Sequence, residues 1–344
     1  GLGAAGAASL AGCAGFSLES GNQEPPLAEN RPDAVYFPTH TEGMAMAGMA
    51  SDGAYKAALT FGYPHRFWTV TGNDTNRVTV GENDSVHLMP VVWHAETGII
   101  VPDVSPNITI EQDGESVTTN APWPMLSQRM GFHFGDNVQL PSEGTYDVTV
   151  DVGEPSGRRV GSLAEAGPAS FSFSMEYSRS TLQETAFTDI PDAKQGTLGA
   201  APAMGMGMTP SSTVPEADAL PGTLRGEGAS GDADFVVGTL EDSTAYGGAG
   251  DEPYLYVSAR TPYNRFQLPL MSLSATLTRG GETVYDGYLQ STVSDDLNVH
   301  YGAAVPSVES GDELTITVDA PPQASRHEGY ETAFLNMEPV ELTL

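Results

Sequence analysis

Short runs of Val, Thr and aromatic residues recur along the chain, and turn-forming residues separate them. Alternation of apolar and polar positions with a period of two is typical of strands that bury one face. Turn signals such as Gly72-Asn73-Asp74 and Asp113-Gly114 lie between the runs, and no stretch has a helical period over ten residues. The pattern therefore predicts an all-β protein built from β-sandwiches. In the first half, the predicted strands are 34–37, 55–61, 67–70, 77–80, 86–93, 108–111, 145–152 and 170–177.

A change of composition after Tyr177 divides the chain. Residues 196–231 are rich in Gly, Ala, Pro, Ser and Met and have no strand or helix period, which is typical of a linker or a long mobile loop. A chain of 344 residues is long enough for two domains. We predict two β-sandwich domains, residues 34–178 and 233–344, joined by a linker over residues 179–232.

The acidic balance narrows the classes of partner. With 45 acidic and 14 basic residues the net charge is −31, and the acidic residues are spread along the whole chain. Such a surface resembles that of halophilic proteins. In those proteins, salt screens the repulsion between the carboxylates, and the hydration of the carboxylates keeps the protein soluble. Nucleic acid is not expected as a partner, because its phosphates would be repelled.

The N-terminal segment, residues 1–33, resembles a signal remnant followed by a tether. Leu10-Ala11-Gly12-Cys13 resembles a lipoprotein signal box, in which Cys13 would carry the lipid. Cys13 is the only cysteine, so no disulfide can form within one chain. Residues 17–33 are polar and contain proline, as a tether would. We predict an extracytoplasmic protein anchored by lipid to the outer face of the cell membrane; the alternative is a flexible terminus with a chance cysteine.

Two stretches bring histidines and methionines onto strands that we expect to be neighbours. His87 and Met89 are two residues apart, so they project from the same face of a strand. Met125, Met130 and His133 lie in the stretch 124–138. Thioether sulfur suits Cu(I), and imidazole suits Cu, Fe or Zn. The sequence therefore predicts a site for a copper or iron ion.

The same stretches resemble the periplasmic iron- and copper-binding proteins of bacterial high-affinity ferrous-iron uptake. Their pattern is His-x-Glu, then PM-x6-HYG-x-N-[VI], then Gly-Arg-His. Here the elements read His87-Leu88-Met89, then Pro124-Met125 and, one residue later than in the pattern, HFGDNV from His133, then Gly157-Arg158-Arg159. Met replaces Glu in the first element and Arg replaces His in the third. The resemblance covers roughly residues 34–177 and implies an immunoglobulin-like, cupredoxin-like sandwich that handles metal without catalysis.

A further group of possible ligands follows the first predicted strand. His40, Glu42 and Met44 lie in a glycine-containing segment that could collect metal or close over the first site. We expect Met46 and Met49 to fill gaps in the core instead. His65 and His94 are ranked below the other histidines, His65 as a turn or packing residue or a support for a ligand, and His94 because its side chain should point away from His87.

The second half resembles the first when His300-Tyr301-Gly302 is placed on His133-Phe134-Gly135. Tyr254 and Tyr256 then fall on His87 and Met89, and His327 falls at the third element, where the first half has Arg159. One hypothesis is an internal pseudo-dimer in which His327 or His300 completes the first site; a homodimer, which the resemblance implies, is the other arrangement. The alternatives are a separate Fe(III) site of Tyr254, Tyr256, His300 and His327, or a second half that is structural.

These features predict a metal-binding lipoprotein for copper or iron uptake or handling, with a membrane iron permease or reductase as a possible partner. No catalytic cysteine, G-x-S-x-G or H-E-x-x-H motif is present, so no enzymatic activity is expected. A blue-copper electron carrier is disfavoured because such a site needs a cysteine thiolate. The alternative function is a non-catalytic cell-surface module for adhesion or scaffolding.

Overall fold

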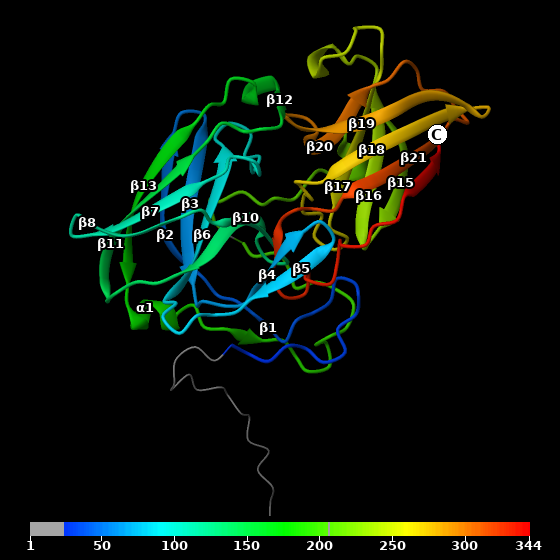
Figure 1. Ribbon diagram of the computed structural model, residues 1–344. Helices are drawn as coiled ribbons and strands as arrows, with labels where there is room; N and C mark the ends of the chain where they lie inside the picture. The colour runs from blue at the N-terminus through cyan, green and yellow to red at the C-terminus, as the bar shows by residue number, and fades with distance from the viewer. Residues whose placement is uncertain (1–23, 206) are drawn as a thin grey trace, which may run out of the picture.

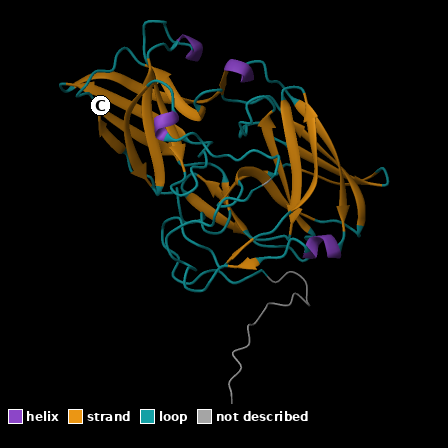
Figure 2. Cartoon of the chain, turned by 180° about the vertical axis from the view of Figure 1, so that it is seen from behind, coloured by secondary structure: helices purple, strands orange, loops and turns teal. Residues whose placement is uncertain are grey.

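The computed structural model describes residues 24–205 and 207–344. Over these residues the protein is built from β-strands arranged in several sheets, as Figures 1 and 2 show from two sides. The prediction of an all-β protein is confirmed. Helical elements in this part are short: α1 (Arg179–Gln183), η1 (Gly161–Leu163), η2 (Ala217–Ala219) and η3 (Thr244–Tyr246). None of the helices in the described ranges is long and apolar enough to span a membrane.

The largest sheet of the first half contains eight strands in the order β2-β3-β6-β10-β9-β22-β4-β5. Its central strand β6 is buried along its whole length, which explains its nearly continuous apolar sequence VHLMPVVWH. The strands are β2 (Ala45–Asp52), β3 (Tyr55–Gly62), β4 (Phe67–Thr71), β5 (Asp74–Val78), β6 (Val86–His94), β9 (Trp123–Ser127), β10 (Gly131–Val138) and β22 (Ser325–Arg326).

A four-stranded sheet in the order β13-β11-β7-β8 packs against β2 and β3 of this sheet. In β13 every second side chain is buried, as ASFSFSMEY predicts for a strand with one solvent-facing side. We call these two sheets the first lobe. The remaining strands of this half are β7 (Asn107–Gln112), β8 (Glu115–Asn120), β11 (Gly144–Val152) and β13 (Ala169–Tyr177), and a separate pair joins β1 (His40–Thr41) to β14 (Thr188–Asp189).

A nine-stranded sheet, which we call the second lobe, carries the yellow, orange and red strands of Figure 1. Its main order is β15-β16-β17-β20-β19-β18-β21-β23, and β12 pairs with β19. The strands are β12 (Arg158–Val160), β15 (Thr223–Ser230), β16 (Ala233–Leu240), β17 (Tyr254–Arg260), β18 (Ser272–Arg279), β19 (Glu282–Ser294), β20 (Asn298–Ala304), β21 (Glu313–Ala320) and β23 (Val340–Thr343).

The two halves exchange short strands. β22, near the end of the chain, lies between β9 and β4 in the first lobe, where it runs parallel to β9 and antiparallel to β4. In the other direction, β12 leaves the first half and runs parallel to β19 of the second lobe. Because of this exchange, the residue after β22, His327, lies within the first lobe.

Several local features differ from the sequence-based expectation. Residues 34–37 form only an isolated bridge at Tyr36, and β15 begins inside the range predicted as linker. Residues 45–49, the later part of the segment that could collect metal, belong to strand β2, which pairs with β3. Met46 and Met49 are 46% and 37% exposed, so the expectation that they fill core gaps is wrong: β2 is at the sheet edge and turns these side chains outward.

Candidate metal centre

The centre of the site is built by the antiparallel neighbours of β10. His133 on β10 lies opposite Met125 on β9, and Asn137 on β10 lies opposite His87 on β6. Residues 133, 135 and 137 project from the same face of the strand because its side chains alternate. One face of β10 therefore carries His133 and Asn137 toward His87 and Met125.

Gly135 leaves the space in which these donors meet. A Cβ atom at this position would lie 2.8 Å from His87 Nε2 and 2.9 Å from Met125 Sδ. Both distances are shorter than side-chain contacts normally allow, so only glycine permits both donor atoms to point here. The glycine of the HFGDNV stretch is thus part of the site's geometry.

Two further histidines complete a cluster of four imidazoles. Donor nitrogens of His65, His87 and His327 all lie within 4.8 Å of one another, and all three residues are buried. His133 Nε2 is 3.2 Å from His327 Nε2. We call these four residues, His65, His87, His133 and His327, the imidazole cluster.

Hydrogen bonds fix which ring nitrogen of each histidine faces the cluster. The Nδ1 atoms of His65 and His133 lie 2.9 and 3.1 Å from the carbonyl oxygens of Tyr63 and Gly131. His87 Nδ1 lies 2.8 Å from Asn137 Oδ1. Since these oxygens only accept, each Nδ1 must donate, and each neutral ring keeps an unprotonated Nε2.

Asn137 orients two members of the cluster at once. Its Oδ1 accepts from His87 Nδ1, and its Nδ2 donates to the backbone carbonyl of His65 at 2.9 Å. A hydrogen bond from outside a metal site that fixes the tautomer and ring plane of a ligand is the usual support for a ligating histidine. Asn137 is therefore a positioning residue.

The environment keeps the imidazoles of His65, His87 and His133 neutral. Burial, and then the nearby His327, lowers the pKa of His65 to about 4. Burial also lowers the pKa of His87 and of His133 well below the usual range, with smaller effects from neighbouring imidazoles. At neutral pH these rings offer lone pairs to a cation without first losing a proton.

The donor set fits a copper ion and also accommodates iron. Among the described residues, Nε2 of His65 and of His87 and Nδ1 of His327 are buried and lack hydrogen-bond partners, which is costly unless a ligand satisfies them. Several imidazole nitrogens with a thioether, Met125, match the preference of copper. A bound cation would stabilise atoms that the protein itself leaves unsatisfied.

The segment before β2 reaches the edge of this cluster. Glu42 Oε1 is 3.8 Å from His327 Nδ1. Burial by itself would raise the pKa of Glu42, but the neighbouring His327 and His65 hold that pKa well below the usual range. Met44 and Met89 line a small cavity with Glu42, His65 and His327. His40 is outside this group, with Nδ1 at 2.9 Å from Thr39 Oγ1 and its ring against Phe187.

His300 is not near the imidazole cluster. It lies in the second lobe, where its Nε2 is 3.1 Å from the hydroxyl of Tyr254 and its Nδ1 is 2.9 Å from the carbonyl of Asn298. Of the two histidines that the pseudo-dimer hypothesis offered to the first site, the structure brings only His327 to it. His94 lies at the other end of β6, and its Nδ1 is 3.0 Å from Thr97 Oγ1.

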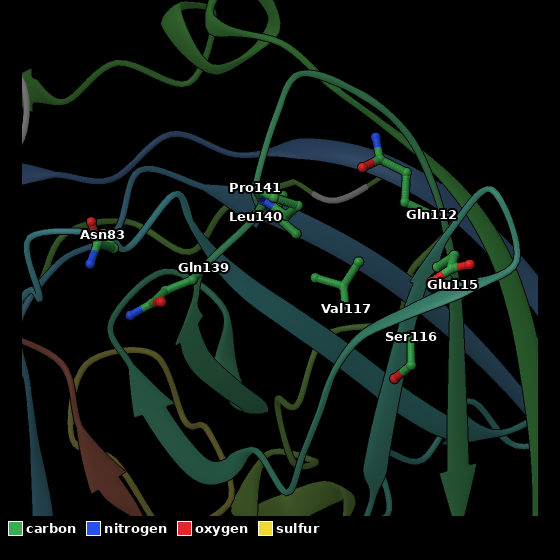
Figure 3. Close-up of a pocket in the computed structure, with 8 residues that line it drawn as sticks. All are labelled: Asn83, Gln112, Glu115, Ser116, Val117, Gln139, Leu140 and Pro141. Atoms are coloured by element: carbon green, nitrogen blue, oxygen red, sulfur yellow. The ribbon is translucent and has the colours of Figure 1, made fainter.

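A larger hollow than the small cavity beside the cluster lies elsewhere, and Figure 3 shows the residues that line it. Amide, hydroxyl and aliphatic side chains and one carboxylate, Glu115, line it, and no histidine or methionine is among its lining residues. It offers none of the donors that the cluster offers.

Comparison with known families gives one match in each half of the chain. Residues 82–177 match the Fe2+ transport protein family. This match includes His87, Met89, Met125 and His133, and the expected resemblance is confirmed for this segment. Residues 218–343 match a different model, a domain of unknown function (DUF7350). No match is found among curated proteins.

Solved structures of low sequence identity match about 40% of the chain. FetP of uropathogenic E. coli is 20% identical with a TM-score of 0.32, and the match covers 39% of this chain and 95% of FetP. A copper-bound variant of FetP is 19% identical, with a TM-score of 0.30 and coverage of 39% and 97%. A copper-bound variant of Campylobacter jejuni P19 is 13% identical, with a TM-score of 0.30 and coverage of 40% and 98%. These TM-scores are too low to show a common fold.

His65 is the residue of the cluster that sequence reasoning placed outside the ligand set. It lies in the connection between β3 and β4, where Pro64-His65-Arg66 reads as an ordinary turn. A local signal was absent, because its proximity to His87 arises from the hydrogen bonds of Asn137 across the sheet. The Asn of the HFGDNV stretch is the one sequence feature that could have pointed to a supported ligand.

Proposed function

We propose that this protein binds a copper or iron ion in the imidazole cluster and serves the uptake or handling of that metal outside the cytoplasm. The observation that carries the proposal is the set of buried nitrogen atoms without partners on His65, His87 and His327. Unsatisfied buried polar atoms are rare in proteins, and here they belong to three histidines that each place a ring nitrogen within 4.8 Å of the others. The match of residues 82–177 to the Fe2+ transport protein family supports the same reading.

The ligands of the proposed site are His65, His87, His133, His327 and Met125. Met89 and Met44 lie beside them, and Glu42 supplies the nearest carboxylate. His327 comes from the second half of the same chain, which is the arrangement that the internal pseudo-dimer hypothesis describes. The function requires no catalytic group, and the protein acts as a carrier.

The proposal includes features of the chain beyond this site. The two lobes are two immunoglobulin-like or cupredoxin-like sandwiches related by duplication, and the acidic surface suits a salt-rich environment. Cys13, outside the described residues, carries the lipid that anchors the protein to the outer face of the membrane. A membrane iron permease or reductase is the proposed recipient of the ion.

Metal binding by the full-length chain is the test. Elemental analysis and titration with Cu(I), Cu(II) and Fe(II) in high salt compare the wild type with a His87→Ala, His133→Ala double variant. His94→Ala is the matched control, since His94 is also a buried histidine of β6 but lies away from the cluster. We expect the wild type and the His94→Ala control to bind the metal tightly, and the double variant to lose this binding.

Equal and weak binding by all three proteins would mean that the metal associates only with the acidic surface. The metal function would then be abandoned in favour of an adhesion or scaffold module. Circular dichroism and thermal unfolding of each variant separate loss of ligand from loss of fold.

A further inference from the structure

A small cavity beside the imidazole cluster is lined by an unusual number of methionines. Its volume is about 20 Å3, enough for about one water or ion. Met44, Met89, Met130 and Met204 all line it, although only 12 of the 344 residues are methionine. We call this space, with the four methionines, the thioether chamber.

The four methionines come from four separate segments of the chain. Met89 on β6 and Met130 in the turn between β9 and β10 are 3% and 6% exposed. Met44, just before β2, and Met204, between the two lobes, are partly exposed. The chamber therefore has buried thioethers on the inside and accessible ones at its mouth.

Backbone contacts hold both accessible methionines in place. The N–H of Met204 donates to the carbonyl of Arg129 at 2.8 Å, which fastens residue 204 beside the turn that carries Met130. On the other side, Gly62 allows close packing against the segment of Met44, because a Cβ at Gly62 would lie 2.6 Å from the carbonyl oxygen of Gly43. These positions are built into the fold and do not depend on side-chain packing alone.

The chamber shares two of its walls with the imidazole cluster. His65 and His327 line it, and each has a buried nitrogen without a hydrogen-bond partner among the described residues. An ion in the chamber would thus be next to unsatisfied imidazole nitrogens. Methionine packing in a core does not require such nitrogens, so the combination indicates a ligand.

We propose that the thioether chamber is a second binding position, which captures Cu(I) and delivers it to the imidazole cluster. This inference rests on the proposed function, because the cluster is the destination. Thioethers are neutral and soft, need no deprotonation, and suit Cu(I) better than Cu(II), Fe(II) or Zn(II). Copper enters and leaves the chamber as Cu(I), so the transfer involves no electron and no proton.

The experiment removes the accessible thioethers while keeping side-chain volume. Met44→Leu with Met204→Leu is compared with a matched control, Met49→Leu with Met208→Leu. The control takes one methionine from β2 and one from the same connecting segment, both outside the chamber and 37% and 82% exposed. Leu and Met have similar volume, so both double variants should fold.

Anaerobic Cu(I) loading of the full chain is followed by stopped-flow competition with a chromophoric Cu(I) chelator. We expect the chamber variant to load about tenfold more slowly, because it lacks the two accessible thioethers; tenfold in rate corresponds to about 1.4 kcal/mol in the barrier. Its Cu(II) affinity, which reports the imidazole cluster, should be unchanged, and the control should match the wild type. Equal loading by the wild type and the chamber variant would overturn the chamber, as would an equal loss in the control.

A second measurement uses the His87→Ala, His133→Ala background. Residual Cu(I) binding should persist there, and X-ray absorption should show a sulfur shell around the copper. This binding should disappear when Met44→Leu and Met204→Leu are added. Binding that persists after the addition would refute the chamber. If the histidine background does not fold, the loading rates decide alone. A wild type that binds neither Cu(I) nor Cu(II) would instead refute the proposed function.

Discussion

The strand pair β6–β10 of the first lobe and the pair β17–β20 of the second lobe have the same register but differ in chemistry. His87 lies opposite Asn137 in the first, and Tyr254 lies opposite Ala304 in the second, each 167 positions further along the chain. His133 and His300 are separated by the same interval. The two pairs therefore present equivalent backbone positions with different side chains.

In the second lobe, the polar side chains on β17 and β20 that correspond to the metal-site positions have hydrogen-bond partners. His300 Nδ1 donates to the carbonyl of Asn298, and its Nε2 faces the hydroxyl of Tyr254 at 3.1 Å. The hydroxyl of Tyr256 donates to the carbonyl of Pro221 at 2.9 Å. In the first lobe, His87 occupies the position equivalent to Tyr254, and its Nε2 has no hydrogen-bond partner. At these equivalent positions, the polar side-chain atoms are hydrogen-bonded in the second lobe, whereas His87 Nε2 in the first lobe is not.

The space around the equivalent glycines, Gly135 and Gly302, also differs between the two lobes. A Cβ at Gly135 would meet two potential metal ligands, His87 Nε2 and Met125 Sδ. A Cβ at Gly302, the equivalent position, would lie 2.3 Å from the hydroxyl oxygen of Tyr254. The tyrosine occupies the space that the first lobe leaves between its donors. A shared strand arrangement is thus compatible with metal binding only where donors are left unpaired around a gap.

The largest effect should come from filling that gap. Gly135→Ala should weaken copper binding at least about 100-fold, because the new methyl group displaces His87 Nε2 and Met125 Sδ. Gly302→Ala should leave copper affinity unchanged and instead lower the free energy of unfolding by about 1–3 kcal/mol through overpacking against Tyr254. Titration calorimetry and urea unfolding of both variants measure the two effects. Equal copper affinities for the two variants would break the comparison.

Replacing the positioning residue should make the first lobe resemble the second. Asn137→Ala gives β10 the residue that β20 has at Ala304. The loss of hydrogen bonds to His87 and His65 should reduce copper affinity about 10–100-fold, because the rings are no longer fixed. Asn120→Ala is the control, since Asn120 contacts Asp136 on the same strand but none of the histidines. Unchanged affinity for Asn137→Ala would remove its positioning role.

Acid should destabilise the metal-free protein through buried histidines in both lobes. Copper should reduce this loss of stability only in the first lobe. Burial lowers the pKa of His65 and of His300 to about 4, whereas an unfolded histidine titrates near about 6.5. The unfolded chain therefore binds more protons, and stability that is fully present above about pH 6.5 is lost as the pH falls toward about 4.

Urea unfolding between about pH 7 and pH 4, with and without copper, measures this dependence. Copper should reduce the loss through the first lobe, where protons and metal compete for the same nitrogens. A metal-free protein with constant stability over this range would contradict the assignment of buried neutral histidines.

The smallest effect is expected from loss of the hydrogen bond between Tyr254 and His300 in the second lobe. Tyr254→Phe leaves His300 Nε2 without a partner and should lower the free energy of unfolding by about 1–3 kcal/mol. Copper affinity should remain that of the wild type, because His300 is not in the imidazole cluster. A change in copper affinity would show that the second lobe takes part in binding. Thermal unfolding and copper titration of the same sample provide both readouts.

Local sequence patterns predicted most strands of the first half. The runs at 55–61, 86–93, 145–152 and 170–177 correspond closely to β3, β6, β11 and β13, since their alternation or continuous apolar character reflects burial directly. The strand β2 was missed because its alanines, glycine and methionines have no clear period of two. The isolated bridge at Tyr36 shows the reverse case, an aromatic run that does not extend into a sheet.

The sequence by itself determined the all-β class and the pairing of two ligand types on neighbouring strands. His87 and Met89 share strand β6, and Met125 and His133 are joined by one tight turn, so local spacing is sufficient to place them. Such spacing acts only over a few residues. It could indicate donors, but it could not show whether those donors are satisfied.

The tertiary structure alone decided which histidines meet. His133 and His327 are 194 positions apart, and they approach because β22 enters the first lobe beside β9. The same packing brings His65 to His87 and leaves His300 with Tyr254 in the other lobe. Contacts between distant segments depend on sheet order and burial, and these are properties of the whole chain that no local pattern contains.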